Sequence, residues 1–384
     1  MVNRTAKLSL LYGFYWVAAC MVYSYAELFL KHFGFRTDQV GMVVALGYLA
    51  GMIVQPALAQ AADRERRVTL RSGVAGCAAV GVAIAIALPL CKSVLPVVAV
   101  LFGAMTCVTL ASQPLVNAVG FHYINRGEPL DYSFARGAAS VAYALASLLF
   151  GRIAESNVEA MLWVYLAVNA AIFLLALWFA PHRSGIGETR SGSSLLSVIL
   201  RYPRLVLFCV GNLVLNVPHM FINSYLASIT AVTGGDMSVM IALAAVVEFP
   251  AMMAYSHIRK RVPDHVLLIA SASVYLLKTG LLLLAATTGA GIWTVYASSA
   301  LQMLCYAIFV PASSYYANDI VDTADQVKGQ MLLTETGLLS GMISMLFGGL
   351  SIEHFGVPFS LLLCEGLVAI GVVLVALGVR KPKR

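Results

Sequence analysis

The sequence has few charged residues for its length. Only 11% of its 384 residues are Asp, Glu, Lys or Arg, whereas 60% are hydrophobic and the mean hydropathy is +0.85. Soluble domains carry about 25% charged residues, so this composition excludes a water-soluble fold of this length. We expect the lipid bilayer to be the solvent of most side chains.

The motifs of the common enzyme classes are also missing. The sequence contains no phosphate-binding GxxxxGK segment, no HExxH zinc motif and no paired aspartate motif. Its seven cysteines stand singly in apolar stretches, without a CxxC pair or a histidine at metal spacing. We therefore predict that the protein is not an enzyme, that it has no catalytic residues and that it binds no cofactor or metal.

Long apolar runs, by contrast, fill most of the chain. Cutting the sequence at charged and turn residues leaves twelve runs, each close to the roughly 20 residues that a helix needs to cross a bilayer. The runs cover residues 8–30, 39–60, 70–90, 94–121, 134–153, 160–180, 205–231, 238–256, 266–287, 292–317, 329–351 and 358–379. We predict an all-α membrane protein with twelve transmembrane helices, the first of them retained rather than cleaved as a signal peptide.

Basic residues alternate between the two sides of these runs. Nineteen of the 25 Lys and Arg residues lie in segments on one side, four lie on the other, and Arg136 and Lys278 lie within runs. Because basic loops stay in the cytoplasm, we expect a multi-pass protein of the bacterial inner (cytoplasmic) membrane with both termini cytoplasmic. The net charge of +7 then reflects membrane orientation and not nucleic-acid binding.

The two halves of the sequence resemble each other. The segment 63–67 recurs as 257–261 after 194 residues, and the segment 147–151 recurs as 344–348 after 197 residues. Two six-helix repeats in the same orientation place a substrate site near mid-membrane between them and allow rocking about that site. The sequence therefore predicts the architecture of a transporter.

The longest polar stretch separates the sixth run from the seventh and is rich in Gly and Ser. This composition is typical of a linker. We expect an N-terminal six-helix bundle at 1–180, a cytoplasmic linker at 181–203 and a C-terminal six-helix bundle at 204–384.

With this organisation, the chain resembles the major facilitator superfamily over its whole length. Its loop Asp63-Arg64-Glu65-Arg66-Arg67 is a degenerate form of the family's basic loop between the second and third spans, without the usual Gly before the last basic pair. The resemblance implies the major facilitator fold of two pseudo-symmetric six-helix bundles. It also implies that Asp63, Arg64 and Arg67 act in conformational gating.

The segment 130–140 resembles the fifth-helix motif of the oligosaccharide, nucleoside and phenylpropionate proton symporters, in which an Arg precedes a small pair and an aromatic residue. Arg136 holds the position of that Arg, and Tyr143 follows two turns later on the same helical face. The resemblance implies substrate binding, since a guanidinium suits ring hydroxyls or a carboxylate and an aromatic ring suits a sugar or a base. The family's acidic partner on the fourth span falls near Asn117, so that feature is absent or moved. The alternative is that Arg136 snorkels to the cytoplasmic interface.

Further candidates for solute binding are side chains that donate and accept hydrogen bonds. They lie on the fourth, seventh and tenth runs: Gln113, Asn117, Asn212, Asn216, His219, Asn223 and Gln302. The four on the seventh run share one helical stripe, which suits a neutral polyol or a nucleoside; hydrogen bonding between helices is the alternative. Aromatic residues crowd the first run, where we expect most to pack or to lie at the membrane interface and one or two to stack on substrate: Tyr12, Phe14, Tyr15, Trp16, Tyr23 and Tyr25.

Glu248 and Lys278 are candidates for proton coupling. Sugar symporters of the superfamily are similar in carrying a Glu on the eighth span, and a buried carboxyl suits a reversible proton carrier. Lys278 lies at similar depth on the ninth run, so we expect an ion pair that protonation of Glu248 opens. A permanent ion pair that fixes helix packing is the alternative.

The tenth run departs from the family, because Cys305 and Ile308 take the positions of its proton-handling His and Glu. Proton coupling must then use Glu248, Glu335 or Glu27. Glu335 lies in the cytoplasmic half of the eleventh run and Glu27 in the outer third of the first run. For both, a cap near the water interface is the alternative.

From these features we expect a monomeric secondary active transporter that works by alternating access. It would take up a small-molecule substrate, a sugar, a glycoside or a nucleoside, together with protons, and its other partner is the lipid bilayer. Aromatic-acid uptake, with Arg136 meeting a carboxylate, is one alternative, and drug/proton efflux is another. A solute sensor on a transporter fold is the alternative outside transport.

Overall fold

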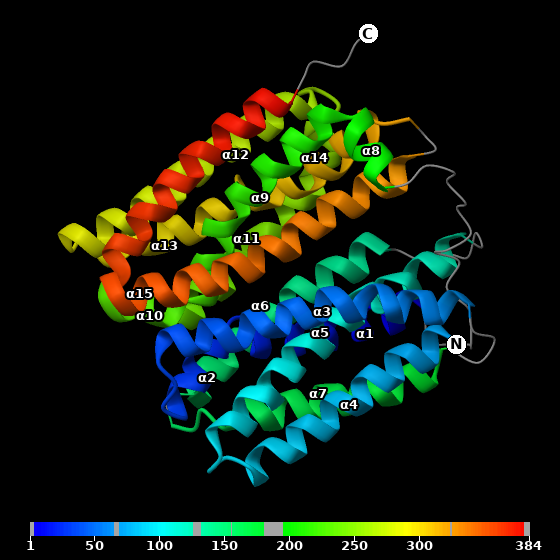
Figure 1. The fold of residues 1–384 in the computed structure, drawn as a ribbon, viewed down its shortest axis with the longest axis vertical. Helices are drawn as coiled ribbons and strands as arrows, with labels where there is room; N and C mark the ends of the chain where they lie inside the picture. Colours follow the sequence, from blue (N-terminus) through cyan, green and yellow to red (C-terminus); the bar gives the residue numbers. More distant parts are fainter. Residues whose placement is uncertain are drawn as a thin grey trace. The chain divides into compact units, whose positions relative to one another are not determined.

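The computed structural model describes residues 4–64, 69–125, 132–154, 156–179, 195–322 and 325–379. Within these ranges every regular element is a helix, which confirms the all-α prediction. The chain divides into two compact units, Met1–Arg190 and Ser191–Arg384, and Figure 1 labels the helices of each.

The first unit is a bundle in which α1 contacts α5, α6 and α7, while α3 packs along α5 and α4 along α7. Its helices are α1 (Arg4–Tyr23), α2 (Ala26–His32), α3 (Thr37–Arg64), α4 (Leu70–Leu90), α5 (Leu95–Asn125), α6 (Tyr132–Ala154) and α7 (Ala160–Leu177). Buried apolar side chains from α1, α4, α5, α6 and α7, such as Leu8, Val74, Leu115 and Ile172, form its core. Helix α1 is therefore packed against three long helices of its unit.

The second unit is built around α9, which packs along α15. Its helices are α8 (Leu195–Arg201), α9 (Pro203–Ser224), α10 (Leu226–Thr233), α11 (Met237–Ile258), α12 (Asp264–Thr288), α13 (Ile292–Ala300), the 3₁₀ turn η1 (Leu301–Met303), α14 (Tyr306–Asp319) and α15 (Gln326–Gly378). Glycines let α9 and α15 approach closely, since a Cβ built on Gly211 would lie 2.8 Å from the backbone nitrogen of Val375.

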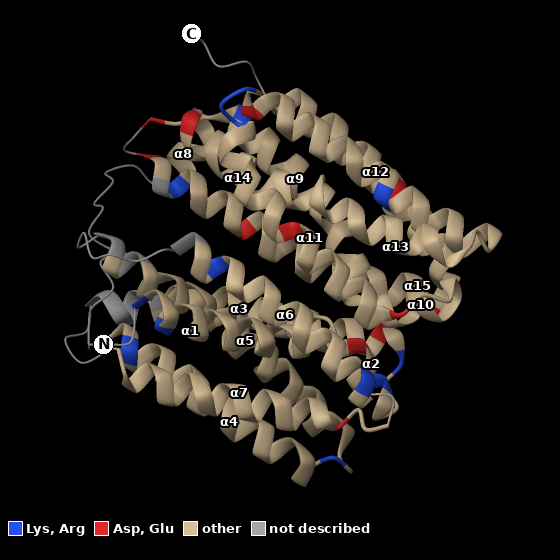
Figure 2. Ribbon diagram, turned by 180° about the vertical axis from the view of Figure 1, so that it is seen from behind, with Lys and Arg blue, Asp and Glu red and all other residues tan. Residues whose placement is uncertain are grey.

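The long helix α15 contains two spans. Gly356 interrupts it with a φ of 79°, in the left-handed region that favours glycine. Among the described residues, eleven helical segments are long and apolar enough to cross a membrane, and the last of them, Lys328–Gly378, includes this break. Most charged residues lie near helix ends, and a few lie within the helices (Figure 2). The prediction of twelve spans is therefore confirmed.

Three runs predicted as single helices are broken, which corrects the prediction. The first run of each half breaks at a Ser-Tyr pair, between α1 and α2 at Tyr25 and between α9 and α10 at Tyr225. The hydroxyl of Tyr25 donates to the main-chain oxygen of Ser147 at 2.9 Å, and that of Tyr225 donates to Met345 at 2.7 Å. Each tyrosine thus ties the break to the fifth span of its own half. The tenth run breaks at η1.

The predicted linker 181–203 contains the helix α8, and its residues 181–194 lie outside the described residues. Val198 of α8 is fully buried in an apolar cluster that includes Leu205 and Ala317. At the end of α8, Arg201 forms an ion pair of 2.7 Å with Asp322. Part of the expected linker is therefore a helix docked on the second unit.

Candidate functional site

In the first unit, Arg136 and Tyr143 meet at the indole of Trp16. The guanidinium carbon of Arg136 lies 4.6 Å from the centroid of the Trp16 ring. The ring of Tyr143 approaches the same indole edge-on, with centroids 6.2 Å apart. A cation over an aromatic face gains about 0.5–2 kcal/mol, depending on its exposure. One side chain of α1 therefore joins the two candidates that lie two turns apart on α6.

The same region of α1 carries two further polar contacts. The hydroxyl oxygens of Tyr143 and Ser24 lie 2.7 Å apart, so Tyr143 reaches the break between α1 and α2. The hydroxyl of Tyr12 donates to Asn117 Oδ1 at 2.9 Å. Gln113, also a candidate, is half-buried one turn before Asn117 on α5. The first unit thus offers a guanidinium, aromatic rings and hydroxyl or amide groups along α1.

In the second unit, Lys278 is 2% exposed and binds the tenth span. Its ammonium donates to Gln302 Oε1 at 2.5 Å, and its main-chain oxygen accepts from the Ser298 hydroxyl at 2.8 Å. The sequence did not indicate Gln302 as an acceptor for this ammonium. Glu248 is half-buried on α11 and acts on Lys278 through its charge. The ion pair between Glu248 and Lys278 stays a prediction.

His219 lies against two tyrosines inside the second unit. Its ring stacks on Tyr306 of α14 with centroids 4.6 Å apart, and Tyr275 of α12 meets it edge-on at 5.7 Å. His219 Nε2 and Asn223 Nδ2 are 3.1 Å apart. His219 Nδ1 and the Tyr275 hydroxyl are buried and form no hydrogen bond within the described parts of the chain. The site thus contains polar atoms that the protein itself leaves unsatisfied.

The other half of the seventh-span stripe serves helix packing. Asn216 donates its amide to the main-chain oxygen of Asn212 at 2.9 Å and to its Oδ1 at 2.7 Å. Asn212 in turn donates to the Thr336 hydroxyl on α15 at 2.9 Å. For Asn212 and Asn216 these contacts favour the alternative of hydrogen bonding within the bundle.

The remaining acidic candidates are Glu27 and Glu335. Glu27 is fully buried on α2, where the Lys31 ammonium lies 2.8 Å from its carboxylate. Glu335 is half-buried in the part of α15 before Gly356. Among the gating candidates, the side chains of Asp63 and Arg64 and all of Arg67 lie outside the described residues.

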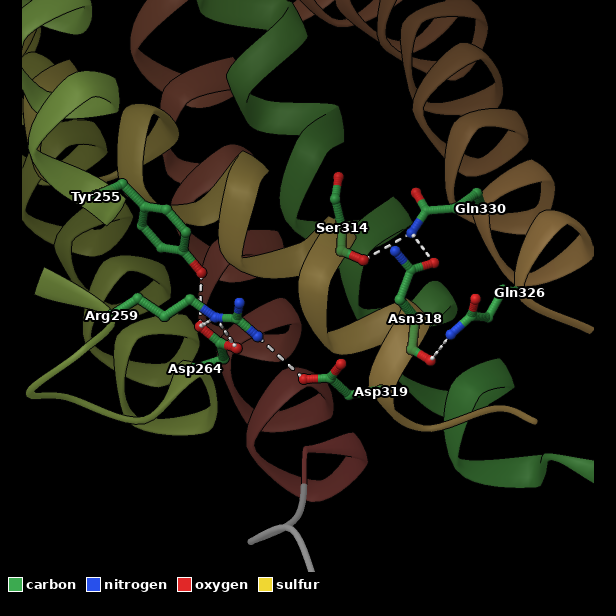
Figure 3. A network of polar contacts seen from close by, with 8 residues as sticks. All are labelled: Tyr255, Arg259, Asp264, Ser314, Asn318, Asp319, Gln326 and Gln330. Atoms are coloured by element: carbon green, nitrogen blue, oxygen red, sulfur yellow. Dashed lines mark hydrogen bonds and ion pairs between the residues drawn. The ribbon is translucent and has the colours of Figure 1, made fainter. Parts of the chain in front are cut away.

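The repeat of that gating segment in the second unit is a charged network at the ends of α11, α12 and α14 (Figure 3). Arg259 donates to Asp264 at 2.9 Å and to Asp319 at 3.2 Å, and its guanidinium lies 3.7 Å above the ring centroid of Tyr315. Burial would lower the pKa of Arg259, but the Asp264 carboxylate outweighs that effect and raises it. The Tyr255 hydroxyl also donates to Asp264. These contacts join three helix ends.

A second set of contacts in Figure 3 adds α15 to this end of the unit. The Gln330 amide donates to Asn318 Oδ1 at 3.0 Å, and the Gln326 amide donates to the main-chain oxygen of Asn318 at 3.2 Å. Hydrogen bonds and ion pairs thus join four helices of the second unit at the same end of the bundle.

Sequence reasoning missed Trp16, Tyr275, Ser298 and Tyr306 as members of these clusters. Trp16 is one of several aromatics in its run, and nothing in the spacing separates it from the others. Tyr275 lies three residues before Lys278, nearly one turn away on the same face. That spacing is the signal that could have identified it.

Comparison with known proteins agrees with this architecture. The sequence model of the MFS_1 like family matches residues 5–362, and no curated protein matches the sequence. The fold is similar to that of a mutant of the nucleoside transporter NupG, with a TM-score of 0.83 and 13% identity over 98% of this chain and 100% of that one. It is also similar to a D-xylose-proton symporter, with a TM-score of 0.76 and 12% identity over 97% of this chain and 96% of that one.

A bacterial homolog of the human lysosomal transporter Spinster is similar as well, with a TM-score of 0.69 and 14% identity, covering 97% of this chain and 96% of that one. At such identities these likenesses concern the fold alone.

Proposed function

The chain belongs to the MFS_1 like family of major facilitator transporters, and from this premise we propose that it takes up a nucleoside or a sugar together with protons. The chain is a multi-pass membrane transporter and not an enzyme, so it requires a solute-binding site and a group that couples transport to protons. We place solute binding on the cluster around Trp16 and coupling on Glu248. We further propose that the protein works as a monomer by alternating access. It lies in the bacterial inner membrane with both termini in the cytoplasm.

The observation that carries the solute class is the contact between Arg136 and Trp16. An indole offers its face to the apolar side of a ring, while a guanidinium and the Tyr143 hydroxyl offer donors to ring hydroxyls. Ring compounds with several hydroxyl groups match that combination. NupG is described as a nucleoside transporter and another structural neighbour as a D-xylose-proton symporter, and both solutes belong to this class.

Glu248 is our candidate for the proton carrier because it is half-buried in the middle of α11 and its charge acts on Lys278. Burial and a nearby charge are the two features that adapt a carboxyl to reversible proton uptake. Glu27 is a weaker candidate, since Lys31 neutralises it. Gating at Asp63, Arg64 and Arg67 stays part of the proposal.

Uptake of an aromatic acid is the second candidate. Lys278 favours it, because the hydrogen-bond acceptor of this buried ammonium is the neutral amide of Gln302. A carboxylate would bind either this ammonium or the guanidinium of Arg136 more strongly than a hydroxyl does.

A thermal-shift screen of the purified protein separates these candidates. A solute that binds the folded state raises the melting temperature. We expect a nucleoside or a sugar to do so in the native protein and not in Arg136→Ala. A shift with aromatic acids alone would replace the first candidate by the second.

A further inference from the structure

The tenth span breaks where its sequence gives no local reason to break. Helix α13 ends at Ala300, the 3₁₀ turn η1 follows, and α14 begins at Tyr306. Residues 300–306 contain neither Pro nor Gly, which are the usual causes of a sharp kink. Cys305 nevertheless has a φ of −88° and a ψ of −85°, outside the helical region. Contacts with other helices must therefore maintain the break.

Lys278 of α12 supplies two of these contacts. Its ammonium donates to Gln302 within the break, and its main-chain oxygen accepts from Ser298 just before the break. All three residues are at most 5% exposed, so both bonds lie away from water. A hydrogen bond from a buried ammonium is among the stronger ones in a protein. Lys278 thus fixes the tenth span to α12 at this point.

The broken segment covers polar atoms that lack partners. Tyr306 stacks on the ring of His219, and Gln302 accepts a hydrogen bond from the ammonium of Lys278. Next to these residues, His219 Nδ1 and the Tyr275 hydroxyl are buried without a hydrogen bond in the described structure. Burying unpaired polar atoms costs free energy, and displacement of the segment would recover it by exposing them to water or to a solute.

We propose that residues 301–306 are a movable cover, latched by Lys278, over a solute-binding surface formed by Lys278, His219 and Tyr275. An acceptor oxygen of the solute, in a ring hydroxyl or a carboxylate, replaces Gln302 on the ammonium and releases the cover. Glu248 on α11 also acts on Lys278 through its charge. The solute's role rests on the proposed transport function, whereas the latch itself does not.

Cys305 reports on the cover because it lies within it and is fully buried. A thiol reacts with a maleimide as the thiolate, which requires access to water. The experiment uses the full-length protein in proteoliposomes, with the other cysteines replaced by alanine, and measures the rate of Cys305 alkylation by N-ethylmaleimide. Lys278→Met and Gln302→Leu each remove the latch, and we expect each to raise that rate about tenfold or more.

Two controls separate release of the cover from general loosening. Thr279→Val changes the residue beside Lys278, but among the described residues the Thr279 hydroxyl bonds within its own helix, to the main-chain oxygen of Tyr275 at 2.9 Å. It should leave Cys305 labelling unchanged. A second reporter keeps only Cys209, which is 4% exposed on α9 and packs in the cluster with Val198 instead of the cover. Its labelling should not respond to the latch variants.

Unchanged Cys305 labelling in both Lys278→Met and Gln302→Leu would overturn the latch, and so would an equal rise at Cys209. Solute arms then test the ligand. Nucleosides or sugars that accelerate Cys305 labelling identify a hydroxyl oxygen, and aromatic acids that do so identify a carboxylate. If neither class changes the rate while the latch variants do, the solute's role is wrong and the latch stands. If the proposed transport function is wrong, the proteoliposomes show no solute exchange, and this result is independent of the Cys305 labelling rates.

Discussion

The guanidinium of Arg136 on α6 lies over the indole of Trp16 on α1, 4.6 Å from its centroid. The face of an aromatic ring attracts a cation and can hold it in this way inside a protein. In our proposal the guanidinium donors bind hydroxyl groups of a solute. The contact also places Tyr143 beside both residues, because Tyr143 meets the same indole.

Arg136→Lys should lower the initial rate of solute uptake about tenfold or more, although the charge is kept. Lysine lacks the planar group that lies over an indole and donates in two directions. Uptake by right-side-out vesicles measures the effect. The matched control is Trp178→Leu, because Lys7 lies over Trp178 in a similar pair, 5.7 Å from the ring, at an exposed position. Equal losses in both variants would contradict a specific role for the Trp16 cluster.

Glu248→Gln should abolish uphill accumulation driven by a proton gradient and spare solute exchange without a gradient. An amide occupies the same volume but cannot carry the proton. Accumulation and exchange are measured in the same proteoliposome preparation. Glu365→Gln is the control, because Glu365 is a half-buried carboxyl in the last span, beside Gly280. Normal accumulation in Glu248→Gln removes Glu248 from the proton-carrying role.

Gly348→Ala should destabilise the second unit by about 1–3 kcal/mol. A Cβ at Gly348 would lie 2.4 Å from the ring of Tyr225, the residue at the break between α9 and α10. Gly337→Ala on the same helix meets nothing within 4 Å and should stabilise the helix by about 0.5–1 kcal/mol. Thermal unfolding in detergent compares them. Equal melting temperatures would show that Tyr225 is not held tightly against the fifth span of its half.

Arg259→Ala should destabilise the second unit by about 1–2 kcal/mol, because it leaves the Asp264 carboxylate without its charged donor. Arg261→Ala removes an exposed arginine two residues later and should have little effect. Unfolding temperatures at low and high salt measure both variants. A similar effect for the two arginines would mean that net charge, rather than the network at the helix ends, sets the stability.

The broken spans show which features the sequence could and could not predict. Membrane spans follow from the length of apolar runs, so their number was predictable. The breaks involve partners far away in the sequence, such as Ser147 for Tyr25, and the Ser-Tyr pair that marks two of them is too short to predict a break. Helical spacing placed Tyr143 on the face of Arg136, yet it could not identify Trp16 on another helix as their common contact.

The same limit applies to Lys278. Its depth in the membrane was readable from its position in the ninth run, and Glu248 was the oppositely charged residue at that depth. Which neighbour a buried side chain meets depends on how helices are placed sideways in the bundle. There the 3₁₀ turn brings Gln302 to the ammonium, a contact that the sequence did not indicate.

Solute counterflow in proteoliposomes tests the central claim most directly. Vesicles loaded with unlabelled nucleoside or sugar should take up the labelled solute transiently through the native protein, and Arg136→Ala should reduce this uptake to that of protein-free vesicles. Absence of exchange for every nucleoside and sugar, or full exchange in Arg136→Ala, would contradict the account.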